Sequence, residues 1–129
     1  MDSKRHRPLN INPFSIQLPL PALISITHRL SGLFLFLCLP ALLWCLNMSL
    51  ESQHSFIKLK KVLTHPLINV LIWLSLAALL FHLLAGMRHL IMDCRIGTSL
   101  KGGRLSAWMI VGLFISTMTF LAVYFGGWL

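Results

Sequence analysis

The sequence is poor in charged residues, and above all in acidic ones: three Asp and Glu residues stand against eleven Lys and Arg. Three long, strongly apolar runs contain no charged residue, and they cover residues 30–50, 62–87 and 105–129; residues 8–28 are also uncharged but hold four prolines and several polar residues. Each run has at least the roughly 20 residues that an α-helix needs to cross about 30 Å of hydrocarbon. These runs leave no room for a separate soluble catalytic domain. We therefore predict a single-domain, all-α membrane protein with three transmembrane helices, at about residues 21–48, 66–92 and 105–128.

The basic residues are unevenly distributed along the chain. Eight of the eleven precede the first apolar run or surround the connection between the second and third spans, which is the same side of the membrane in a three-span chain. The connection between the first and second spans carries only Lys58, Lys60 and Lys61. Because basic residues favour the cytoplasmic side, this bias predicts a cytoplasmic N-terminus and a solvated cytoplasmic turn at residues 93–104. Membrane topology thus accounts for the positive charge, and we expect no nucleic-acid partner.

Several short signals are missing. No small-residue cleavage site follows the first apolar run, so we expect it to stay in the membrane rather than to be removed as a signal peptide. The chain shows no Arg- and Ser-rich presequence, which favours the inner membrane of a bacterium over an imported organellar protein. Cys38, Cys45 and Cys94 form no CxxC or Cys–His pair, so cysteine alone builds no metal site.

Proline indicates where the helices begin. Pro19 or Pro21 is well placed to open the first helix, because proline is tolerated in the first helical turn. Pro40 is expected to bend that helix, and Pro66 to open the second span. Between these two spans, residues 55–63 (SFIKLKKVL) predict a short amphipathic segment along the membrane surface.

The end of the second apolar run carries four unusual residues. His82, Gly86, His89 and Asp93 are spaced by four, three and four residues, so they form one stripe on a helix. If Asp93 lies at the membrane boundary, His82 is about 16 Å deeper at 1.5 Å per residue, near the bilayer midplane. Two interpretations fit. His82 bonds to a neighbouring helix and Gly86 is a packing notch, or His82 is an axial ligand of a haem iron and Gly86 makes space for the macrocycle.

Haem also carries two propionates, which need cationic partners near the membrane surface. His89, Arg88 and Arg29 are candidates for that contact. Simple anchoring at the interface would explain Arg88 and Arg95 equally well.

A second polar cluster lies at the start of the first span. Ser25, His28 and Arg29 share a helix face, because they are three and four residues apart. A hydroxyl and a guanidinium on one face can bind a quinone carbonyl or a carboxylate. The alternative is that Arg29 extends to the interface while Ser25 bonds to its own helix. The cluster by itself does not identify a ligand.

Together the two clusters resemble a known family. The segments RPLNINPFSIQLPLPALISITHRLSG and HLLAGMRHLIMD resemble the larger membrane anchor, the cytochrome b subunit, of succinate dehydrogenase (succinate:quinone oxidoreductase, complex II). The family pattern is Arg-Pro, then Ser-x-x-His-Arg-x-Ser/Thr-Gly, then His-x-x-x-Gly-x-Arg-His-x-x-x-Asp. It is matched closely over residues 7–32 and 78–93, whereas the first loop and the third span match only in kind. Thr27 stands where the family usually has an apolar residue.

The resemblance implies roles for individual residues. His82 would be one axial ligand of haem b, and the second would come from the smaller anchor subunit, which completes the helical bundle. Ser25 and Arg29 would line a ubiquinone pocket, and His28 and His89 would lie near the haem propionates. Asp93 and Arg95 would be structural or close to the iron–sulfur subunit.

The implied function is electron transfer from succinate to quinone, in the respiratory chain and the tricarboxylic acid cycle. The chain itself would not oxidise succinate, because nothing in it resembles a flavin site or an iron–sulfur framework; those reactions would belong to the flavoprotein and iron–sulfur subunits. Two alternatives stay open at this point: a non-redox membrane scaffold, and the anchor of a fumarate reductase.

Overall fold

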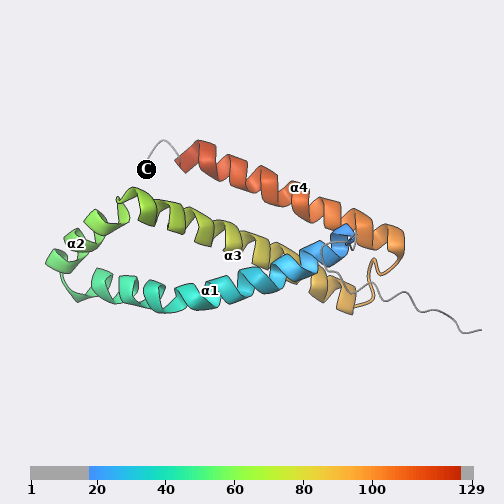
Figure 1. Cartoon of the computed structure of the whole chain (residues 1–129), viewed down its shortest axis with the longest axis horizontal. Coiled ribbons are helices and arrows are strands. Elements are labelled where there is room, and N and C mark those ends of the chain that lie inside the picture. The colour runs from blue at the N-terminus through green and yellow to red at the C-terminus, as the bar shows by residue number, and fades with distance from the viewer. Residues whose placement is uncertain (1–17, 126–129) are drawn as a thin grey trace, which may run out of the picture.

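The fold consists of helices, three of which are long enough to span a membrane (Figure 1). The computed structural model describes residues 18–125. Helix α1 (Leu20–Glu51), α3 (Pro66–Asp93) and α4 (Leu100–Phe125) are the three apolar candidate spans, and the shorter α2 (Gln53–Leu63) joins α1 to α3. The predicted all-α, three-span architecture is therefore confirmed.

The prolines lie where helix openings were predicted. Pro19 is the N-cap of α1 and Pro21 lies in its first turn, while α3 begins at Pro66. His65 caps α3, because its Nδ1 accepts from the backbone N–H of Leu67 at 3.3 Å. Pro40 lies inside α1, which continues as one helix to Glu51.

The connection between α1 and α3 is itself helical. Ser52 opens α2 by accepting a hydrogen bond from the backbone N–H of Ser55 at 3.1 Å. The three lysines of α2 are exposed, whereas Leu59 is buried. The predicted helical segment is thus present, and its position along a membrane surface stays a prediction.

Helix α4 begins at Leu100, whereas the sequence predicted a span from residue 105. Ser99 accounts for the early start: its side chain accepts from the backbone N–H of Gly102 at 3.0 Å, and its carbonyl accepts from Gly103 at 2.8 Å. Only residues 94–99 remain to reverse the chain. Arg95 and Gly97 adopt left-handed backbone conformations there, with φ of 63° and 70°, a region that favours glycine.

The helices pack most closely near one end of the molecule. Ile24 of α1, Ala85 of α3 and Ala107 of α4 form the buried core cluster, and two of these three are small residues that let helix backbones approach. The start of α1, the end of α3 and the start of α4 lie together at this end (Figure 1), as the predicted topology requires. Large apolar side chains along all three long helices are otherwise exposed, which suits contact with lipid and a partner that completes the bundle.

Candidate functional site

His82 extends from α3 toward α1 and is held there by hydrogen bonds. Its Nδ1 lies 3.1 Å from the backbone carbonyl oxygen of His28 and 3.2 Å from Oγ of Ser31. The Ser31 hydroxyl itself donates to the same His28 carbonyl at 2.8 Å. Because a carbonyl oxygen can only accept, Nδ1 must carry the ring proton. In the neutral imidazole, the lone pair of His82 is then on Nε2.

The ring of His82 is also confined sterically. It stacks on the ring of His28, with centroids 4.2 Å apart and planes inclined by 15°. A Cβ atom added to Gly32 would lie 2.8 Å from Cε1 of His82, closer than real contacts allow. Three neighbouring residues of α1, His28, Ser31 and Gly32, thus surround one side of this imidazole.

The predicted stripe on α3 faces α1 over most of its length. His89 meets the edge of the His28 ring, with centroids 5.2 Å apart. Gly86 lies against the same ring, since a Cβ there would be 3.2 Å from Nε2 of His28. Asp93 is exposed at the end of α3 and does not join this group. The structure therefore brings together His28, His82 and His89, which the sequence had placed in two separate motifs.

Within residues 18–125, no group of three or more His, Cys, Asp or Glu side chains is arranged to hold a metal ion. The three cysteines are free thiols, and Cys38 contacts Ser75 Oγ at 3.8 Å between α1 and α3. Any metal held by His82 would consequently need further ligands from a cofactor or from another chain.

Ser25 and Arg29 both lie on α1. Ser25 precedes His28 by three residues, and Arg29 directly follows it. Ser25 is half-buried and Arg29 is exposed. Among the residues that the structure describes, neither side chain hydrogen-bonds to another. The Arg7-Pro8 pair of the predicted pattern lies outside the described residues.

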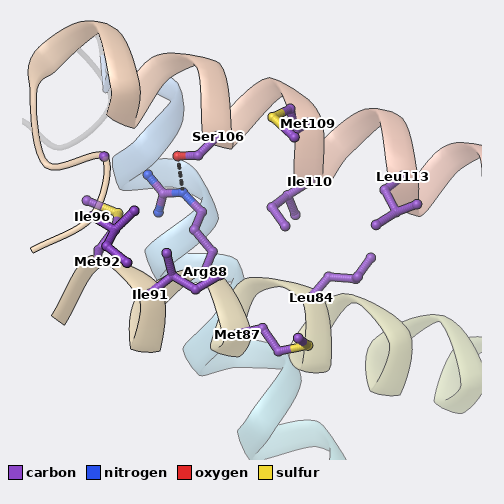
Figure 2. Close-up of a pocket in the computed structure, with 11 residues that line it drawn as sticks. Leu84, Met87, Arg88, Ile91, Met92, Ile96, Ser106, Met109, Ile110 and Leu113 are labelled. Carbon is purple, nitrogen blue, oxygen red and sulfur yellow. Dashed lines mark hydrogen bonds between the residues drawn. The ribbon is translucent and has the colours of Figure 1, made fainter. Parts of the chain in front are cut away.

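Arg88 makes contacts that the sequence did not predict. It was expected at the interface or beside the propionates, yet only 5% of its surface is exposed. Its Nε donates to Ser106 Oγ at 3.0 Å (Figure 2). Its Nη2 donates to the Gly103 carbonyl at 3.1 Å, so both acceptors lie on α4. Arg88 follows Gly86 by two residues, so it leaves the opposite side of α3 from the stripe. Its guanidinium links α3 to α4.

An apolar groove adjoins this link. It has a volume of about 440 Å³ and lies between α3 and α4, where Met87, Ile91 and Ile110 are among its lining residues (Figure 2). The stem of Arg88 contributes to its wall. None of the histidines between residues 18 and 125 lines the groove, so it is distinct from the cluster between α1 and α3.

These features define a class: a three-span membrane protein with a histidine cluster between its first and third helices and hydrogen-bonding groups near the same end. Residues 3–123 match the family described as succinate dehydrogenase/fumarate reductase transmembrane subunit. The chain belongs to this family. With its three apolar spans and its bacterial relatives, it is a multi-pass protein of the bacterial inner membrane.

Individual relatives are similar along most of their length. The chain is 38% identical to a protein of Coxiella burnetii, over 94% of both chains, and 30% identical to one of Paracoccus denitrificans, over 95% of both. A protein of Rickettsia bellii is 33% identical over 68% of both chains. Each of these relatives is named succinate dehydrogenase cytochrome b556 subunit.

Proposed function

We propose that this chain is a cytochrome b anchor subunit of a succinate dehydrogenase, which binds haem b together with a partner subunit and contributes to the site of ubiquinone reduction. The observation that supports this most directly is the state of His82. Its Nδ1–H is engaged by α1, which leaves the Nε2 lone pair for a metal, and this is how metal-ligating histidines are normally held. The family and the names of the relatives support the same function.

The residues present fit one half of a haem site. His82 would supply one axial ligand, and the smaller anchor subunit would supply the other, since the described residues contain no complete set of metal ligands. His28 and His89, beside His82, would contact the propionates through their ring N–H groups. When bound, haem b supplies one-electron storage beside the route to the quinone.

Ser25 and Arg29 would bind the quinone. The hydroxyl and the guanidinium can each donate a hydrogen bond to a quinone oxygen, and Arg29 can stabilise the negative charge that develops there on reduction. Neither side chain hydrogen-bonds to another of the described residues, which is compatible with this contact. The iron–sulfur subunit and the smaller anchor would supply the rest of the pocket.

Succinate oxidation itself is assigned to the flavoprotein and iron–sulfur subunits, docked on the cytoplasmic side. The chain's contribution is to anchor them and to hold quinone within reach of their electrons. A non-redox scaffold would use the same exposed apolar surface. The hydrogen bonds from His82 to α1 would serve a scaffold too, but a scaffold has no use for the Nε2 lone pair of this half-buried imidazole.

The test is a reduced-minus-oxidised visible spectrum of the complex purified through this chain. We expect a b-type signal in the native complex and in a His54→Ala control, whose histidine lies exposed on α2. In the His82→Ala complex the signal should be lost or strongly altered. No haem in the native complex, with its partners present, would favour the scaffold. An assay of fumarate reduction by quinol would distinguish a fumarate reductase from a succinate dehydrogenase. The fumarate reductase alternative predicts that fumarate reduction is faster than succinate oxidation.

A further inference from the structure

Three polar atoms form a small triangle where α1 meets α3. They are Nδ1 of His82, the carbonyl oxygen of His28 and Oγ of Ser31, with sides of 3.1, 3.2 and 2.8 Å. Ser31 is buried, with 8% of its surface exposed, although it is a polar residue in a helix that faces lipid. Nothing in the proposed ligation of haem or quinone uses its hydroxyl.

The protons in this triangle can be assigned. The hydroxyl proton of Ser31 is directed to the His28 carbonyl, so Oγ presents a lone pair to His82. Nδ1–H of His82 then donates to both oxygens in a three-centre bond. In the opposite tautomer, a bare Nδ1 would lie 3.1 Å from the carbonyl oxygen with two lone pairs opposed, which is unfavourable. The triangle therefore selects one tautomer.

The same segment of α1 restricts the direction of the ring. Turning the imidazole over would exchange Nδ1 with a carbon atom and lose both hydrogen bonds. The stacked His28 ring blocks movement of the imidazole toward that face, and the close approach of Gly32 to Cε1 blocks movement in that direction. The orientation of Nε2 thus follows from α1, a helix that supplies no metal ligand of its own.

We propose that Ser31 is a positioning residue for the haem ligand: its hydroxyl and the His28 carbonyl set the tautomer, the orientation and the electron-donating strength of the His82 imidazole. This inference rests on the proposed haem-binding function. A hydrogen bond from Nδ1–H makes an imidazole a stronger donor through Nε2. A stronger donor stabilises ferric over ferrous iron, so the triangle lowers the midpoint potential of the haem.

Removing the hydroxyl should therefore raise that potential. In Ser31→Ala the His28 carbonyl, which already accepts from Nδ1–H, remains, so His82 loses one acceptor and gains none. We expect the haem to stay bound and its midpoint potential to shift to a more positive value. The low-spin ferric electron paramagnetic resonance signal should move as well. Ser31→Thr, which retains a hydroxyl on the same Cβ, should restore the native potential and signal.

The experiment is an optical redox titration of the complete complex carrying each variant. Ser75→Ala is the matched control, because it removes a hydroxyl from the same α1–α3 interface, where Ser75 contacts Cys38 and not His82. A native potential in Ser31→Ala, or an equal shift in Ser75→Ala, would overturn the proposal. If Ser31→Ala does not assemble, Ser31→Cys takes its place, since sulfur is a weak acceptor and the same positive shift is expected. If only Ser31→Thr assembles, and Ser31→Ala and Ser31→Cys do not, the hydroxyl is needed for folding or assembly, and the proposal is overturned.

The His82→Ala complex separates this inference from the function on which it rests. If that complex keeps its haem and spectrum, the assignment of His82 as ligand fails, and the role of Ser31 fails with it. If it loses its haem while Ser31→Ala keeps the native potential, the function stands and only the positioning role is wrong.

Discussion

The imidazole rings of His28 and His82 lie nearly parallel, 4.2 Å apart, although they belong to different helices and are 54 residues apart in the sequence. Stacked pairs of aromatic rings contribute about 0.5–1.5 kcal/mol beyond the area they bury. The pair also makes the position of His82 depend on α1. Substitutions on α1 that touch no cofactor are therefore expected to change haem binding.

Gly32→Ala is the simplest such substitution. The new Cβ would lie 2.8 Å from Cε1 of His82, so the ring must move out of its position between the two helices. Overpacking of this kind costs about 1–3 kcal/mol. We expect the purified complex to contain clearly less haem per protein than the native complex. Gly112→Ala is the control, because a Cβ at this position on α4 meets nothing within 4 Å. Equal haem content in the two variants would contradict the prediction.

Gly86→Ala should have a smaller effect by the same reasoning. Its Cβ would approach Nε2 of His28 to 3.2 Å, a contact that a shift of a few tenths of an ångström relieves. Haem content should then rank Gly112→Ala first, Gly86→Ala second and Gly32→Ala last. A greater loss of haem in Gly86→Ala than in Gly32→Ala would reverse the ranking. It would indicate that Gly86 makes space for the macrocycle itself, which is one of the two interpretations that the sequence allows.

Arg29→Ala tests the quinone assignment. A hydrogen bond to a charged group contributes about 1.5–3 kcal/mol, and each 1.36 kcal/mol in a barrier is about a tenfold change in rate. We expect quinone reduction to fall by about tenfold or more, while succinate oxidation by an artificial soluble acceptor continues at its native rate. Arg104→Ala, which removes an exposed cation near the same end of the molecule, should change neither rate. Equal loss of both activities in assembled Arg29→Ala complex would count against a quinone contact.

The sequence predicted the helices well because each depends on a local signal. Uncharged runs of sufficient length indicate spans, and Pro19, Pro21 and Pro66 lie at the helix openings they predicted. The start of α4 was harder to predict, because Lys101 and the glycines at 102 and 103 are typical of a solvated turn. The cap that Ser99 provides extends the helix across them.

The site was predicted only in part, because spacing along one helix does not determine which neighbour that helix faces. The four-residue and three-residue steps from His82 to His89 correctly placed these histidines on one face. That this face meets His28, with Ser31 and Gly32 beside it, depends on the rotation and depth at which α1 packs against α3. The one local signal for such a contact is a histidine followed closely by two small residues, His28 and then Ser31 and Gly32. That signal alone does not indicate which residue of another helix makes the contact.

Arg88 shows the same limit and leads to the last prediction. Its neighbour His89 belongs to the histidine cluster, yet Arg88 donates two hydrogen bonds to α4, to Ser106 and to the Gly103 carbonyl. Arg88→Ala removes both hydrogen bonds and should lower the free energy of unfolding by about 1.5–3 kcal/mol for each. It should lower the thermal unfolding temperature of the purified complex without changing the haem spectrum. Arg88→Lys should recover little of the loss, because an ammonium group lacks the planar fork of donors that reaches both acceptors.

Arg95→Ala, at an exposed position in the following turn, serves as the control and should leave the unfolding temperature unchanged. If Arg88→Ala instead lost haem while the complex kept its native unfolding temperature, Arg88 would be a partner of the propionates, and its contact with α4 would be secondary.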